Sequence, residues 1–150
     1  MIDANPEALF TRGLESLSRN EWTSALAFFE KAAGLMDKPA YKSYLGLCVA
    51  RERGQIKKGA ALAREAIEAE PDNSIHYLNL GRIYLLQGRV ESAIAAFREG
   101  LSREANEQIA EELRRVGTRR PPPFRFLKRD NPINKYLGII LARLGLRQGG

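Results

Sequence analysis

The chain has 150 residues, of which 44% are hydrophobic and 28% charged, and a formal net charge of +6. This length and composition suit a globular domain and exclude an intrinsically disordered chain. No apolar run is long enough to span a bilayer, and the N-terminal residues lack the pattern of a secretory signal. Cys48 is the only cysteine, which excludes an internal disulfide, so we expect a cytoplasmic protein.

The charge is divided unevenly along the chain. Residues 1–113 carry 14 Lys and Arg against 17 Asp and Glu, a net charge of −3. Residues 114–150 carry 10 Lys and Arg against Asp130 alone, a net charge of +9. The high isoelectric point therefore belongs to the C-terminal part.

Taken in chain order, the first 107 residues contain three similar blocks, at about residues 6–39, 40–73 and 74–107. Each block holds two amphipathic stretches separated by a short turn. Four sets of residues recur at a spacing of 34: Asn20, Gly54 and Gly88; Ala25, Gly59 and Ala93; Phe29, Ala63 and Phe97; and Ala32, Ala66 and Gly100. A period of this length predicts stacked helix pairs, because one pair cannot bury its apolar face alone.

Glycine has two expected roles in these blocks. The residues of the first set end the first helix of each pair, where glycine or asparagine adopts the left-handed conformation. Gly13, Gly46 and Gly81 lie inside the first helices, and we expect each to face the small residue of the second set. Such contacts let two helices approach closely, which offsets the roughly 1 kcal/mol cost of a helical glycine.

The three blocks resemble the tetratricopeptide repeat, which has a period of 34 residues and a Leu-Gly…Tyr…Ala…Phe…Ala…Pro signature. The third block matches it with Tyr77, Leu80, Gly81, Tyr84, Ala93 and Phe97. The second keeps Leu45, Gly46, Ala66 and Pro71, with its first helix offset by one residue, and the first keeps Gly13, Ala25, Phe29 and Ala32. The resemblance implies an all-α, right-handed superhelix whose first helices line a concave groove for peptides or partner helices.

On the register of this family, seven residues are expected to line the groove and bind a partner: Phe10, Leu14, Tyr44, Ile75, Leu78, Asn79 and Arg82. Members that bind chaperones clamp the terminal carboxylates of a peptide with lysines, asparagines and an arginine. Phe10 and Leu14 stand where that clamp needs lysine and asparagine, and Asn79 and Arg82 alone do not replace it. We therefore expect an apolar groove that binds a helix or strand, although several such residues could instead be core between repeats.

A capping helix is expected after the third block. Ile109, Leu113 and Val116 form one apolar stripe on an otherwise charged stretch, and Gly117 is expected to end the helix. Residues 6–117 would thus form one domain of three repeats and a capping helix.

Residues 118–150 are expected to form a Pro-rich basic tail that ends in a short apolar helix. Pro121–Pro123 exclude helix, and Pro132 suits the first position of a helix over the following residues. The expected contact residues of the tail are Arg119, Arg120, Phe124, Phe126, Tyr136, Leu137 and Ile140. The apolar helix could pack on its own repeats, on a second copy or on another protein, while nucleic acid or an anionic membrane is the alternative for the basic tail.

The residues that catalysis needs do not occur in a recognisable pattern. His76 is the only histidine, which excludes histidine-based triads and multi-histidine metal sites, and we expect it at the surface or the groove edge. Cys48 lies among apolar residues and is expected to be buried and inert. We therefore expect no enzyme, no cofactor and no metal, but an adaptor that binds a protein or peptide.

Overall fold

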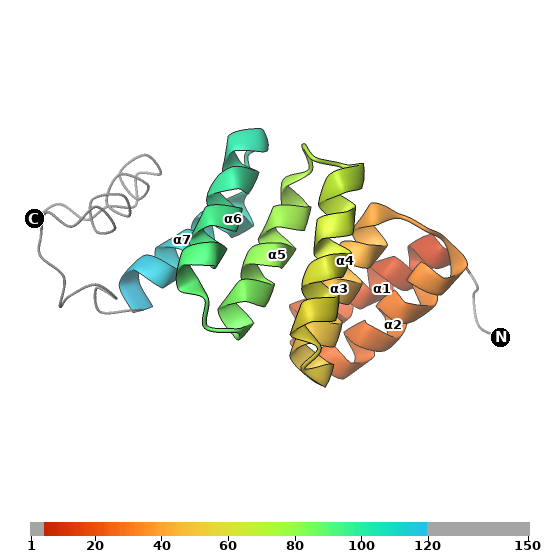
Figure 1. The fold of residues 1–150 in the computed structure, drawn as a ribbon. Coiled ribbons are helices and arrows are strands. Elements are labelled where there is room, and N and C mark those ends of the chain that lie inside the picture. The colour runs from red at the N-terminus through yellow and green to blue at the C-terminus, as the bar shows by residue number, and fades with distance from the viewer. Residues whose placement is uncertain (1–4, 120–150) are drawn as a thin grey trace, which may run out of the picture. The chain divides into compact units, whose positions relative to one another are not determined.

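A computed structural model describes residues 5–119 of the chain and shows seven α-helices and no strand among them (Figure 1). The chain divides into two compact units, Met1–Ala105 and Asn106–Gly150. The first unit contains α1 (Pro6–Ser18), α2 (Trp22–Leu35), α3 (Pro39–Arg53), α4 (Ile56–Ala69), α5 (Ser74–Leu86) and α6 (Val90–Arg103), and the second contains α7 (Glu107–Arg119). The sequence predicts a boundary after residue 117, whereas the units divide before α7.

The helices begin where their sequences supply caps. Asn5 accepts a hydrogen bond from the backbone N–H of Glu7 over 2.9 Å, with Pro6 at the first helical position of α1. Asn73 accepts from the N–H of Ile75 at the start of α5 over 3.0 Å. Both side chains satisfy an N–H group that the helix itself cannot pair.

Each helix pair turns at a residue with positive φ. The φ angles are 64° at Asn20, 67° at Gly54 and 76° at Gly88, which confirms the left-handed turns expected at the 34-residue spacing. Asn20 tolerates this conformation better than most residues with a side chain, and it also accepts a hydrogen bond from Trp22 Nε1 over 2.8 Å. The fold of the described residues is an all-α helical-repeat solenoid, as the sequence predicts.

The glycines inside the first helices face two different kinds of neighbour. A Cβ atom on Gly46 would lie 2.5 Å from the backbone oxygen of Gly59, so α3 and α4 touch through their backbones. Gly13 and Gly81 instead lie under the rings of Phe29 and Phe97, which are fully buried. The expected contact of small residue with small residue is thus confirmed for the middle pair, whereas the nearest atoms to Gly13 and Gly81 belong to an aromatic ring.

Successive pairs pack so that α2 contacts α3, while α5 contacts both α3 and α4. The core at the first junction includes Phe29 and Val49, and the core at the second includes Leu47, Ala63 and Ile83. Continuous burial of this kind explains why the pairs form one unit.

The helix α7 belongs to the second unit and carries the predicted apolar stripe. Ile109, Leu113 and Val116 are all buried. The helix continues to Arg119, so the prediction that Gly117 ends it is wrong. The φ of Gly117 is not positive, and glycine there weakens the helix without terminating it.

Candidate protein-binding face

The first helix of each pair contributes half-buried side chains to one candidate site. We name Phe10 and Leu14 of α1, Tyr44 of α3, and Ile75 and Arg82 of α5 the first-helix face. All five are among the residues that the sequence predicts for partner binding. Each keeps part of its surface exposed, while Phe10, Leu14 and Tyr44 also pack against the core.

Aromatic contacts hold this face together. The rings of Phe10 and Tyr44 meet edge to face with their centres 5.6 Å apart, and Phe10 also lies 4.9 Å from the ring of Tyr41. Below them, the buried ring of Phe29 lies 5.4 Å from that of Tyr44. Aromatic pairs of this kind stabilise beyond simple burial, so these contacts help to hold α1 against α3.

The charge of Arg82 lies close to this aromatic row. Burial raises the pKa of Tyr44 above its ordinary value, and the positive charge of Arg82 partly offsets that rise. The phenol of Tyr44 therefore stays protonated at neutral pH and can donate a hydrogen bond. The face thus combines apolar rings with one cation and one hydroxyl.

Leu78 and Asn79, which the sequence predicts for the groove, lie in the interior. Both are 0% exposed. Asn79 Nδ2 donates to Ser43 Oγ over 2.6 Å and so links α5 to α3. Neither side chain presents atoms to a partner in this structure, because both are fully buried.

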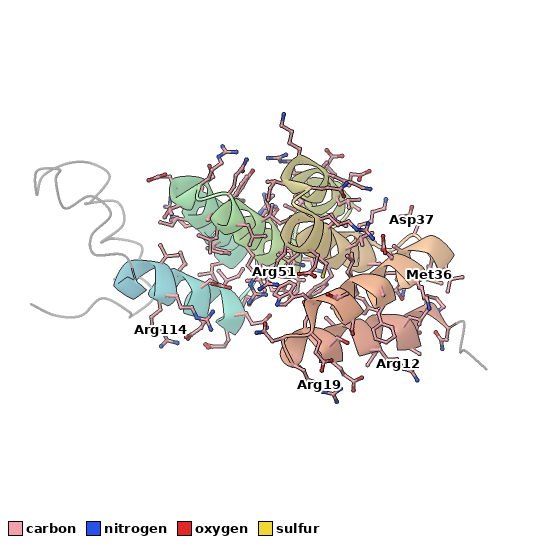
Figure 2. All side chains as sticks on the ribbon, turned by 90° about the horizontal axis from the view of Figure 1, so that it is seen from below. Arg12, Arg19, Met36, Asp37, Arg51 and Arg114 are labelled. Atoms are coloured by element: carbon pink, nitrogen blue, oxygen red, sulfur yellow. The ribbon has the colours of Figure 1, made fainter. Side chains whose placement is uncertain are left out.

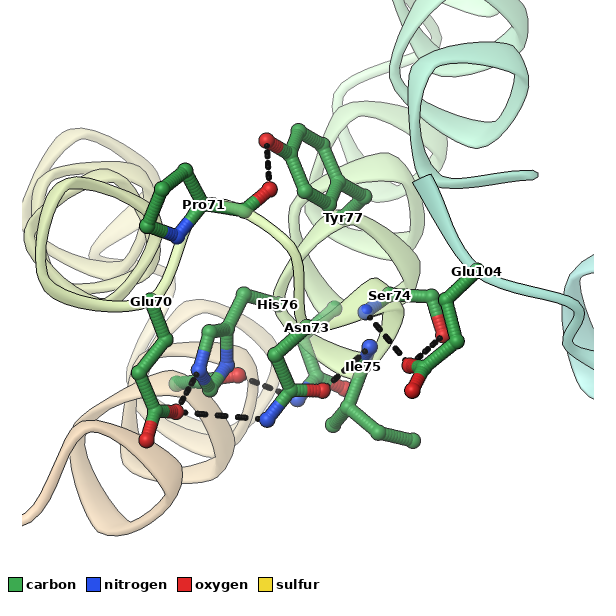
Figure 3. A network of polar contacts seen from close by, with 10 residues as sticks. Glu70, Pro71, Asn73, Ser74, Ile75, His76, Tyr77 and Glu104 are labelled. Carbon is green, nitrogen blue, oxygen red and sulfur yellow. Dashed lines mark hydrogen bonds and ion pairs between the residues drawn. The ribbon is translucent and has the colours of Figure 1, made fainter. Parts of the chain in front are cut away.

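The junction between the second and third pairs is polar (Figure 3). The expectation that His76 lies at the surface is wrong: its ring is fully buried, with Nε2 2.7 Å from Glu70 Oε1. This hydrogen bond is the main cause that lowers the pKa of Glu70. Tyr77 Oη donates to the backbone oxygen of Pro71 over 2.7 Å. These contacts hold the loop between α4 and α5 against the start of α5.

The third pair is closed by a contact between its two ends (Figure 3). The N–H and Oγ of Ser74 both donate to Glu104 Oε1, over 3.0 and 2.8 Å. The backbone N–H is the main cause that lowers the pKa of the Glu104 carboxyl. The carboxylate thus satisfies an N–H at the start of α5, although it comes from the end of α6.

The other chemical candidates are structural. Burial raises the pKa of the Cys48 thiol to about 12, so the thiol is protonated and unreactive at neutral pH, as the sequence predicts. Within residues 5–119, no group of three His, Cys, Asp or Glu side chains is placed to hold a metal ion. No helix in this part of the chain is long and apolar enough to cross a membrane.

Arginines are spread over the surface of the first unit, and they differ in their partners. Arg12 and Arg19 project outward from α1, whereas Arg51 lies over the ring of Trp22 with its Cζ 4.2 Å from the ring centre (Figure 2). Arg64 and Arg89 both lie against Tyr84. This last cluster is not among the predicted sites. The sequence carries one signal of it, since Arg64 stands 34 residues after Glu30 and reverses its charge.

The expected tail contacts cannot be placed on this surface. Arg119 is the last residue of α7. The other six, Arg120, Phe124, Phe126, Tyr136, Leu137 and Ile140, lie outside the described residues.

Comparison with known proteins matches part of the chain to helical-repeat proteins. Residues 44–114 match the tetratricopeptide repeat family. A pentatricopeptide repeat-containing protein of Arabidopsis thaliana is 36% identical over 77 residues, which cover 47% of this chain. These residues span only 18% of that relative, so the comparison concerns a part of it.

Solved structures share the fold at low sequence identity. The TPR domain of Arabidopsis OM64 is 20% identical, with a TM-score of 0.59, and covers 77% of this chain and 96% of its own. The first TPR domain of Spaghetti (RPAP3), bound to the HSP90 peptide SRMEEVD, is 16% identical, with a TM-score of 0.58 and coverage of 79% and 95%. PcrH, in complex with the chaperone-binding region of PopB, is 15% identical, with a TM-score of 0.54 and coverage of 97% and 95%. Residues 44–114 therefore match the tetratricopeptide repeat family, and the described residues have the repeated helix pairs of that fold.

Proposed function

We propose that the chain is a non-catalytic adaptor that binds a peptide or helix of a partner protein on the first-helix face. Two of the similar structures support binding of this class, since RPAP3 is bound to an HSP90 peptide and PcrH to a region of PopB. The tetratricopeptide fold is typically a protein-interaction module. What distinguishes this chain is the chemistry that the face offers.

The observation that carries the proposal is the pair Phe10 and Leu14. Both side chains are half-buried on α1, where members that clamp terminal carboxylates need lysine and asparagine. Phe10 is further fixed against the ring of Tyr44. A fixed, partly exposed apolar surface gains from burying apolar groups of a partner, whereas it offers no charge to a terminal carboxylate.

The chemistry of the partner follows from this surface. Two or three apolar side chains on one side of a helix or strand would cover Phe10, Leu14 and Tyr44. A hydrogen-bond acceptor would meet the Tyr44 hydroxyl, and a negative charge nearby would be attracted to Arg82. The proposed ligand is therefore an amphipathic segment rather than an acidic C-terminus.

The test uses peptides selected from a random displayed library on the full chain, with Kd measured by fluorescence anisotropy. The variant Leu14→Asp should weaken the selected peptides by about tenfold or more, because it places a charge in an apolar contact. Thr11→Asp, at an exposed position of the same helix, is the matched control and should leave Kd unchanged. Equal Kd values for Leu14→Asp and Thr11→Asp, with both folded by circular dichroism, would remove the face as the binding site.

A second measurement separates this chain from the clamp-bearing members. The peptide SRMEEVD should show no saturable binding in calorimetry at millimolar concentration. Micromolar binding of this peptide would overturn the inference that the first-helix face binds apolar side chains rather than a terminal carboxylate.

The basic C-terminal part supports a second candidate function, association with nucleic acid or an anionic membrane. Its net charge of +9 over residues 114–150 favours the binding of phosphates. The full chain should then shift a single-stranded oligonucleotide or bind phosphatidylserine vesicles at low salt, and release them at high salt. A variant with Arg119 and Arg120 changed to Gln should weaken both, whereas Arg12→Gln should not.

Self-association through the apolar residues near the C-terminus is a related proposal. Sedimentation of the full chain at several concentrations tests it. A dimer that Leu137→Asp converts to a monomer would support it, and a monomer at all concentrations would refute it.

A further inference from the structure

A surface of the first unit, separate from the first-helix face, gathers two guanidinium groups around one tyrosine. Tyr84 of α5 is half-buried, and the Cζ atoms of Arg64 and Arg89 lie 5.8 and 5.1 Å from the centre of its ring. Arg64 comes from α4, and Arg89 precedes α6. Tyr84 follows Arg82 by two residues, which is about 200° around a helix, so it faces away from the first-helix face.

Every polar side-chain group in this cluster has a hydrogen to donate. Arg64 Nη2 donates to Tyr84 Oη over 2.6 Å, so the phenol oxygen accepts and its own hydrogen stays available. A guanidinium has several N–H donors and no acceptor. Among residues 5–119, neither Arg64 nor Arg89 forms an ion pair with a carboxylate. The cluster thus offers donors and positive charge without a matching acceptor.

At the junction between the first and second helix pairs, a carboxylate occupies the repeat position that Arg64 occupies at the next junction. Arg53 donates to both carboxylate oxygens of Glu30, over 2.8 and 3.1 Å. Glu30 of α2 stands 34 residues before Arg64 of α4, so the two occupy the same position in successive repeats. Where the first junction has a carboxylate that neutralises an arginine, the second has an arginine of its own, and Arg89 adds another charge.

We propose that Arg64, Tyr84 and Arg89 form a binding site for a dianionic phosphate group. A phosphate monoester carries about −1.5 to −2 charges at neutral pH and three acceptor oxygens, which match two guanidinium groups and one hydroxyl. A single carboxylate would neutralise only one of the two arginines. The half-buried ring of Tyr84 supports each cation by cation–π contact before a ligand arrives. This site does not depend on the function proposed for the first-helix face.

The test is a titration of the full chain with sodium phosphate, followed by the arginine Nε–Hε signals in ¹H–¹⁵N NMR spectra at constant ionic strength. The signals of Arg64 and Arg89 should shift and saturate. Arg64→Gln and Arg89→Gln should each raise the Kd about tenfold, since each removes charged hydrogen bonds. Tyr84→Phe keeps the ring and should raise the Kd several-fold. Arg12→Gln, an exposed arginine on α1, should change nothing.

Parallel titrations with O-phosphoserine and with acetate identify the ligand chemistry. Tighter binding of O-phosphoserine than of phosphate would support a phosphorylated side chain of a partner, and equal binding would support recognition of phosphate itself. Acetate binding as tightly as phosphate would overturn the assignment to a dianion. Shifts that do not saturate, or that Arg12→Gln weakens equally, would mean an adventitious ion only. Each variant is checked by circular dichroism, so that a loss of binding is not a loss of fold.

Discussion

The outer helix pairs and the middle pair of this protein solve one packing problem in two ways. In the outer pairs, Phe29 and Phe97 place their rings over Gly13 and Gly81. In the middle pair the corresponding residue is Ala63, and the backbones of Gly46 and Gly59 meet directly. The glycine of the first helix therefore does not by itself determine what packs on it. The packing also depends on the residue at the position of Phe29, Ala63 and Phe97 in the second helix.

The largest effect is expected where an outer pair loses its ring. Phe97→Ala should lower the free energy of unfolding by about 3–5 kcal/mol, because the ring is fully buried and leaves a cavity over Gly81. Urea denaturation followed by circular dichroism measures this loss. Ala63 offers the contrast, since Ala63→Phe should also destabilise the protein by overpacking the close contact of α3 with α4. If Ala63→Phe proved stabilising, the middle pair would have room for a ring, and its packing would not differ from that of the outer pairs.

The next effect is expected in the middle pair. Gly46→Ala should cost about 1–3 kcal/mol, because its Cβ would lie 2.5 Å from a backbone oxygen that cannot turn aside. Gly34→Ala is the matched control, since nothing lies within 4 Å of a Cβ there. This control should raise the free energy of unfolding by up to about 1 kcal/mol through helix propensity. A Gly46→Ala variant as stable as the Gly34→Ala variant would contradict the close backbone contact.

A double-mutant cycle sharpens the comparison further. Gly81→Ala conflicts with the Phe97 ring, so the cost of Gly81→Ala should fall by about 1 kcal/mol or more when Phe97 is changed to Leu. Gly46→Ala conflicts with backbone, so its cost should not change when the neighbouring Ala63 is changed to Gly. Urea denaturation of the wild type and the six variants measures both cycles. Equal coupling in the two cycles would mean that the outer and middle pairs pack alike.

The smallest effect is expected at the polar junction between the middle and third pairs. The hydrogen bond with His76 lowers the pKa of Glu70, so its contribution to stability is present above the ordinary pKa of 4.5 and is lost as the pH falls through the lowered value. Glu70→Gln should therefore reduce stability at neutral pH and flatten the loss of stability below pH 4.5. Thermal unfolding at several pH values measures this, with the exposed residue Glu21 changed to Gln as the control. An unchanged acid dependence in Glu70→Gln would exclude the junction as its source.

The helix pairs and turns could be predicted from the sequence because a 34-residue period reports local structure. The turn at Gly54 and the burial of Cys48 follow from residue type and spacing alone. The sequence did not reveal that Leu78 and Asn79 are covered, because α5 packs on two other helices and periodicity does not say which faces they occupy. The hydrogen bond from Asn79 to Ser43 joins residues 36 apart, so it depends on the tertiary arrangement.

Part of the candidate site could be predicted from the 34-residue period. Phe10, Leu14 and Tyr44 were predicted for the first-helix face from their register, and in the structure they are half-buried. The cluster at Tyr84 draws Arg64 from the helix before it and Arg89 from the turn after it, so three separate positions must meet in space. Only the charge reversal relative to Glu30 hints at it in the sequence.

The contact of Ser74 with Glu104 has a mechanical consequence. It joins the first residue of α5 to the residue that follows α6, so it bridges the entry and the exit of the third pair. Tension that enters the chain at Ser74 can pass to Glu104 through two hydrogen bonds without passing along either helix. Until that short link breaks, it carries part of a pull that would otherwise load the two helices of the third pair.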